Sequence, residues 1–133
     1  MILATLSEMT GGWFVGDFTP SVLRSQACEV AVKSYNAGDC EALHHHRIAT
    51  EVTVVVSGTV EMLGLRWEAG DIIVVDPGDA TDFRACTQAV CVVVKTPSVI
   101  GDKYAGVIED RRNVDQQAWD RQEAAGASRP DVF

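Results

Sequence analysis

All three histidines of the chain are consecutive, at positions 44 to 46, and Glu51 follows five residues after the last of them. Neighbouring side chains of an extended strand point to opposite faces, so His44 and His46 can converge on one point while His45 turns away. Two neutral imidazoles and one carboxylate form a 2-His-1-carboxylate set, which binds a divalent transition metal and leaves positions open. The other interpretation of such a run is a solvated turn with no ligand.

Glu51 can join the two histidines only if the chain turns between them. Its offset from His46 is odd, so on one straight strand it would face the opposite side. We therefore expect residues 47–50 (RIAT) to form a turn or bulge, and Glu51 to open the next strand. That strand would place Glu51, Thr53 and Val55 on one face, which makes Thr53 a candidate pocket residue.

Short segments rich in β-branched residues must position these side chains. Turn signals such as NAGDC, SG, EAG and PGDA separate them, and no long segment with helical periodicity interrupts residues 10–96. This pattern predicts a β-sandwich or barrel. The segment 71–76 (DIIVVD) is apolar at successive positions, so we expect it to be buried on both faces. The expected strands are 13–18, 27–35, 51–57, 59–67, 71–76 and 89–96.

Composition indicates one globular domain and excludes some partners. The chain has 133 residues, of which 47% are hydrophobic and 23% charged. Its net charge is −8 and its Lys and Arg residues do not cluster, so we expect neither a nucleic-acid nor a membrane partner. Without a long apolar run or a secretion signal, a cytoplasmic protein is expected. No cysteine pair has Cys-x-x-Cys spacing, and Cys28, Cys86 and Cys91 are expected to be reduced and buried.

The spacing around the histidines resembles the first motif of the cupin superfamily. That motif reads Gly, five residues, His-x-His, three or four residues, Glu, six residues, Gly. Every position is matched here, with four residues before the glutamate, by Gly38, His44, His46, Glu51 and Gly58.

The second cupin motif, Gly, five residues, Pro-x-Gly, two residues, His, is matched only in part by GDIIVVDPGDATDF. Gly70 and Gly78 fit, whereas Asp76 takes the place of the usual proline. Thr81 stands where the motif has a histidine that completes the metal site in metal-bearing members. The adjacent Asp82 could replace it only if the strand register shifted by one residue.

The resemblance implies an all-β fold, a small single-domain RmlC-like cupin whose double-stranded β-helix (jelly-roll) barrel covers residues 25–100. Residues 1–24 would form an N-terminal arm whose strand can join the sheet of a second subunit, so a homodimer is expected. Residues 101–133 would form a short C-terminal extension with a helix near 115–125 and a loosely ordered tail from about 126.

For the site, the resemblance implies metal ligation by His44, His46 and Glu51, with iron(II) favoured over manganese, zinc or nickel. Lys95 closes an apolar strand, so its ammonium group either lies in water or enters the cavity as an anion contact. The expected ligand is a small oxygen-bearing molecule.

Three functions remain open, since fold alone does not choose among them. The first is a metal-dependent protein, with or without catalytic activity on that molecule. The second is a metal-free sugar isomerase or epimerase, with His44 or His46 as general base and Tyr35 or Tyr104 as acid. The third is a non-catalytic module that binds or senses a small molecule.

Overall fold

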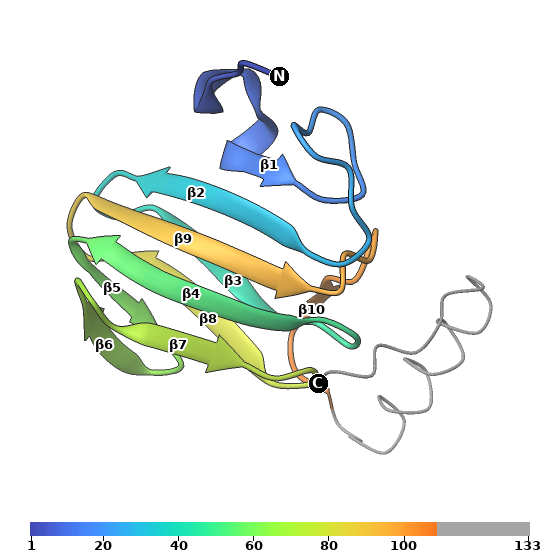
Figure 1. The fold of residues 1–133 in the computed structure, drawn as a ribbon. Helices are drawn as coiled ribbons and strands as arrows, with labels where there is room; N and C mark the ends of the chain where they lie inside the picture. Colours follow the sequence, from blue (N-terminus) through green and yellow to red (C-terminus); the bar gives the residue numbers. More distant parts are fainter. Residues whose placement is uncertain (109–133) are drawn as a thin grey trace.

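Two antiparallel sheets face each other and enclose the interior of the molecule (Figure 1). The computed structural model describes residues 1–108, and in this range each sheet has five strands. The first sheet contains, in spatial order, β1 (Trp13–Val15), β2 (Glu29–Tyr35), β9 (Ala89–Thr96), β4 (Thr50–Ser57) and β7 (Ile72–Val75). The second contains β10 (Tyr104–Ala105), β3 (Cys40–His45), β8 (Ala80–Ala85), β5 (Thr59–Met62) and β6 (Leu65–Glu68). The predicted all-β, two-sheet architecture is confirmed.

Alternation along each strand separates an interior face from an exterior face. In β4, Glu51, Thr53 and Val55 are buried, as their shared parity predicts. The interior changes character along this strand, from polar at Glu51 and Thr53 to apolar at Val55. The apolar part continues into one hydrophobic cluster built from both sheets, which includes Ala31, Val55, Val60, Met62, Ile73, Val75, Phe83, Ala85, Ala89, Cys91 and Val93.

The expectation that residues 71–76 are buried on both faces is wrong. Ile73 and Val75 are buried, but Ile72 is 62% exposed and Val74 is 55% exposed. β7 is the edge strand of its sheet, and only one of its faces packs on the interior. An edge position depends on strand order, which a local run of β-branched residues does not reveal.

The expected single strand 59–67 is instead a hairpin of β5 and β6. Leu63 and Gly64 connect the two strands with φ angles of 56° and 70°. Positive φ at both central residues is what a two-residue type I′ turn requires. Leucine seldom adopts this conformation, so the sequence signalled the turn only through Gly64.

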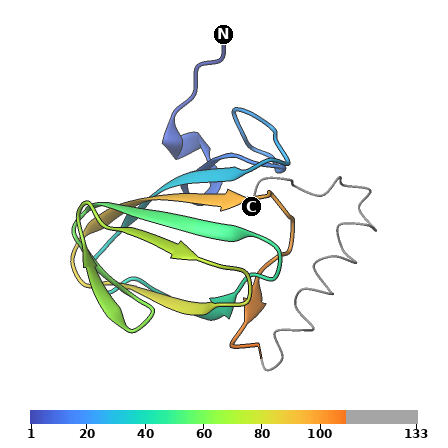
Figure 2. The ribbon, with the colours of Figure 1, turned by 60° about the horizontal axis from the view of Figure 1, so that its bottom comes forward.

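The sheets extend beyond residues 25–100 at both ends. β1 pairs with β2 of the same chain, and β10 pairs with β3. Between β9 and β10 the chain runs across one end of the barrel from the first sheet to the second (orange in Figure 2). The helix expected near 115–125 and the tail from 126 lie outside the described residues.

Two further expectations concern membranes and cysteines. In residues 1–108 no helix has the length and apolar character needed to cross a bilayer. All four cysteines are free thiols. Cys91 is buried as expected, whereas Cys28 and Cys86 are only half-buried and Cys40 is exposed.

Val55 and Val56 provide a matched test of the interior. Val55 is fully buried in the cluster and Val56 is 53% exposed. We expect Val55→Ala to lower the free energy of unfolding by about 2 kcal/mol, because two buried methyl groups are lost and a cavity remains. Val56→Ala should change it by less than about 0.5 kcal/mol. Urea denaturation measures both, and equal losses would contradict the assigned faces.

Candidate functional site

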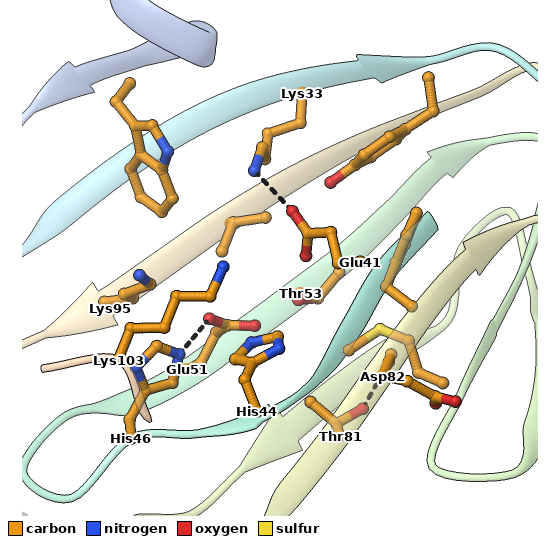
Figure 3. Close-up of a pocket in the computed structure, with 15 residues that line it drawn as sticks. Lys33, Glu41, His44, His46, Glu51, Thr53, Thr81, Asp82, Lys95 and Lys103 are labelled. Atoms are coloured by element: carbon orange, nitrogen blue, oxygen red, sulfur yellow. Dashed lines mark hydrogen bonds and ion pairs between the residues drawn. The ribbon is translucent and has the colours of Figure 1, made fainter. Parts of the chain in front are cut away.

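A cavity of about 210 Å³ opens between the two sheets, at the polar end of the interior (Figure 3). Its lining residues come from β1, β2, β3, β4, β5, β8 and β9, together with His46 and Lys103. The seven residues predicted as metal ligands or pocket residues all border it: His44, His46, Glu51, Thr53, Thr81, Asp82 and Lys95.

The three histidines separate as strand parity predicts. His44 and His46 are buried at the cavity, with ring centroids 5.4 Å apart in an edge-to-face arrangement. His45 is buried on the other side, where its ring stacks on Tyr104 with centroids 5.5 Å apart. Its Nδ1 donates to the carbonyl of Gly106 at 2.7 Å. His45 therefore fastens β3 to β10 and does not reach the cavity.

Backbone carbonyls fix the tautomer of both cavity histidines. Nδ1 of His44 lies 2.8 Å from the carbonyl oxygen of Ala42, and Nδ1 of His46 contacts that of Asp102. A carbonyl oxygen can only accept, so each Nδ1 carries the proton and each Nε2 has a lone pair in the neutral ring. Metal-binding histidines are commonly oriented by such a second hydrogen bond.

Nε2 of His46 lies 3.2 Å from Oε2 of Glu51. Because Nδ1 of His46 already carries a proton, a hydrogen bond from Nε2 requires the doubly protonated, positively charged ring. In the neutral ring, two lone-pair atoms would face each other, which is favourable only with a cation between them.

Glu51 is an ionised carboxylate at neutral pH despite its burial. Burial alone would raise the pKa of Glu51. The hydrogen bond from His46 and the positive charges of His46, Lys95 and His44 outweigh that effect, so the pKa lies below its ordinary value of 4.5.

The turn required between His46 and Glu51 is present, and Asp102 holds it. The buried carboxylate of Asp102 accepts the backbone N–H of Arg47 at 2.9 Å, of Ile48 at 3.1 Å and of Ala49 at 2.8 Å. Its backbone carbonyl accepts a hydrogen bond from the Nδ1–H group of His46. Asp102 therefore sets both the path of the turn and the orientation of one candidate ligand. Sequence reasoning missed it, since no local pattern links residue 102 to residues 46–49.

Thr81 and Asp82 do not supply a fourth ligand in this arrangement. Thr81 pairs with His44 across β3 and β8, and its hydroxyl donates to the carbonyl of Asp82 at 2.7 Å. Asp82 borders the cavity, but it is exposed and its carboxylate points away from the histidines (Figure 3). The β8 parity that turns Thr81 and Phe83 inward turns Asp82 outward.

The donor chemistry fits a divalent transition metal, although the donors are not gathered around one point. Within residues 1–108, no three His, Cys, Asp or Glu side chains stand together as a ready metal-binding group. Nε2 of His46 faces Glu51 instead of a position shared with His44. Two imidazole lone pairs and one ionised carboxylate still make a suitable set. Coordination would require the contact between His46 and Glu51 to open around the ion.

Several charged and aromatic residues at the cavity were not anticipated from the sequence. Lys33 forms an ion pair with Glu41 at 3.2 Å. Trp13 also borders the cavity, and Nζ of Lys95 lies 4.8 Å from its ring centroid. Lys103 lies at the same end. Lys33 could have been found, because it has the parity of the interior residues of β2, Ala31 and Tyr35.

Comparison of the sequence with models of protein families and with curated proteins finds no match. Solved structures do match. A double-stranded β-helix protein from Klebsiella pneumoniae is 22% identical, with a TM-score of 0.58 and coverage of 81% of this chain and 92% of its own. An RmlC-like cupin from Desulfovibrio desulfuricans is 23% identical, with a TM-score of 0.53 and coverage of 59% and 79%.

A third solved structure similar to this chain is an enzyme. The DMSP lyase DddQ from Ruegeria pomeroyi is 17% identical, with a TM-score of 0.59 and coverage of 74% of this chain and 51% of its own. At these identities the likeness concerns the fold. The chain has the cupin fold, as the spacing of its first motif predicted.

Asp102 and Asp76 provide a matched test of the turn. We expect Asp102→Asn to lower the free energy of unfolding by about 3 kcal/mol, because a buried charged acceptor of several N–H groups is replaced by a neutral amide. The amides of residues 47–49 should exchange with deuterium faster. Asp76→Asn changes an exposed carboxylate, so urea denaturation should show a change below about 0.5 kcal/mol. If both variants were equally stable, Asp102 would not be what holds the turn.

Proposed function

We propose that this cupin-fold chain binds a divalent transition metal through His44, His46 and Glu51 and holds a small oxygen-bearing molecule beside it. One observation carries the proposal. Nε2 of His46 lies 3.2 Å from Oε2 of Glu51, while the backbone carbonyl of Asp102 accepts a hydrogen bond from the Nδ1–H group of the same ring. The pair therefore needs a cation between its facing atoms, and a metal ion can take the place of the second ring proton.

The nature of the donors suggests which metal would bind. A set of two imidazoles and one carboxylate with open positions suits iron(II) first, then manganese, zinc or nickel. When bound, the metal would supply Lewis-acid polarisation of an oxygen on the bound molecule. Thr81 stands where a fourth ligand would be, and its neutral hydroxyl leaves the site more open than a histidine would.

The remaining residues of the chain would orient and enclose the ligand. The carbonyls of Ala42 and Asp102 hold the two rings, and the ionised Glu51 balances positive charge. Thr53 is buried at the cavity wall. Tyr35 also lines the cavity, and burial raises its pKa above the ordinary value, so its hydroxyl stays protonated and can donate.

A metal-free enzyme is the second candidate, because the same residues resemble an acid–base pair. Glu51 is placed to orient His46, and Tyr35 offers a protonated hydroxyl in the same cavity. The cavity volume of about 210 Å³ equals roughly seven water molecules. A volume of this size suits a single sugar ring, with the nucleotide of a nucleotide-linked sugar outside the cavity.

Activity is not transferred from proteins of similar fold. DddQ is described as a DMSP lyase, whereas the Klebsiella pneumoniae protein is described as uncharacterised. A shared fold at this identity supports many chemistries. Whether this chain is an enzyme or a binding module therefore depends on its ligand. A homodimeric state and a cytoplasmic location stay predictions from the sequence.

Metal content tests the proposal directly. Protein purified without a histidine tag and incubated with iron(II), manganese, zinc or nickel should hold close to one equivalent after desalting, as measured by elemental analysis. His46→Ala should lose the metal, because it removes one nitrogen donor and leaves Glu51 without the imidazole beside it. His45→Phe should keep it, since that ring packs on Tyr104 away from the cavity.

The opposite results are equally clear. Wild-type protein that stays empty with all four metals would overturn the proposal. If empty protein turned over a small sugar and His46→Ala abolished that turnover, the acid–base candidate would replace it. Equal metal loss in the His45 and His46 variants, with both folded by circular dichroism, would show that the metal lies elsewhere.

A further inference from the structure

We propose that the cavity takes a small organic acid, with the carboxylate of the ligand between the ammonium groups of Lys95 and Lys103. The inference rests on the proposed function in one respect, because the other end of the ligand would lie beside His44, His46 and Glu51. It adds the chemical class of that ligand and the residues that select it.

The cavity is rich in positively charged side chains. The chain has a net charge of −8, yet three lysines line this cavity, at positions 33, 95 and 103. Three carboxylates line it as well, and one of them, that of Asp82, is exposed and points away from the histidines. Glu41 is ion-paired with Lys33 at 3.2 Å, and Glu51 contacts His46. Within residues 1–108, neither Lys95 nor Lys103 forms an ion pair, so both ammonium groups are available to an anion.

These two lysines come from different segments of the chain but line the same cavity. Lys95 lies near the end of β9 and Lys103 precedes β10, yet both line the same cavity, and Figure 3 draws both at the end of it that holds His46 and Glu51. Nζ of Lys95 lies 4.8 Å from the ring centroid of Trp13, which holds it at the cavity wall. Lys103 is exposed and marks the side from which solvent can enter. The proposed carboxylate would bind between these two ammonium groups.

Size and charge together define the class of ligand. The two ammonium groups attract an anion, and the two oxygens of a carboxylate can each accept a hydrogen bond from one of them. A volume of about 210 Å³, roughly seven waters, admits an acid of a few carbon atoms. Such an acid can direct a second oxygen toward the histidines while its carboxylate stays at the lysines.

Trp13 provides the signal for the test, because it borders the cavity and contacts Lys95. In the double variant Trp67→Phe/Trp119→Phe, Trp13 is the sole tryptophan. Its fluorescence is then measured while acetate, lactate or pyruvate is added. We expect saturable changes with at least one acid and none with the matching uncharged amide. Lys95→Gln and Lys103→Gln should each weaken binding roughly tenfold, as loss of a charge-assisted hydrogen bond does. Arg66→Gln, exposed on β6, should leave it unchanged.

Three results would overturn the inference: no saturable change with any of the three acids, tighter binding of inorganic phosphate than of the acids, or unchanged affinity in both lysine variants. Thermal unfolding of each variant checks that it is folded. Metal content measured on the same samples separates this inference from the proposed function. Bound metal without acid binding rejects only the inference, and acid binding without metal rejects only the metal site.

Discussion

The buried carboxylate of Asp102 is the constraint on which the candidate site depends. It accepts the backbone N–H groups of three successive residues, 47 to 49, so the chain turns sharply after His46. Without that turn, the odd offset between His46 and Glu51 would point the two side chains to opposite faces. The carbonyl of the same residue also orients the ring of His46. Asp102 thus brings together His46, which directly follows β3, and Glu51, which lies on β4.

The side chains that strand alternation turns inward form an apolar core at one end of the interior and a polar cavity at the other. Along β4, Val55 belongs to the apolar cluster, whereas Glu51 and Thr53 line the cavity. The polar end keeps its charges because they compensate one another: Glu51 stays ionised through His46 and the neighbouring positive groups. A buried carboxylate without such partners would be protonated instead. The contact between Oε2 of Glu51 and Nε2 of His46 needs a cation between the two atoms, either the second ring proton or a metal ion, which is why we propose a metal there.

Much of this could be predicted from the sequence, because parity and motif spacing are local. They give the separation of His44 and His46 from His45, the turn before Glu51 and the inward position of Thr53. Long-range pairing is not local. Nothing near Asp102 indicates that its carboxylate binds the backbone of residues 47–49, or that Lys103 lines the same cavity as Lys95. The exposed face of β7 was missed for the same reason. Its position at the edge of the sheet depends on the order of the strands, which the local sequence does not reveal.

The central claim is that His44, His46 and Glu51 hold one ion. Crystals of the untagged protein grown with manganese, with diffraction recorded for anomalous scattering, test it most directly. We predict one anomalous peak in the cavity, in contact with Nε2 of His44, Nε2 of His46 and the carboxylate of Glu51, with the direct contact between His46 and Glu51 opened. A cavity without a peak, with Nε2 of His46 still on Oε2 of Glu51, would contradict the account.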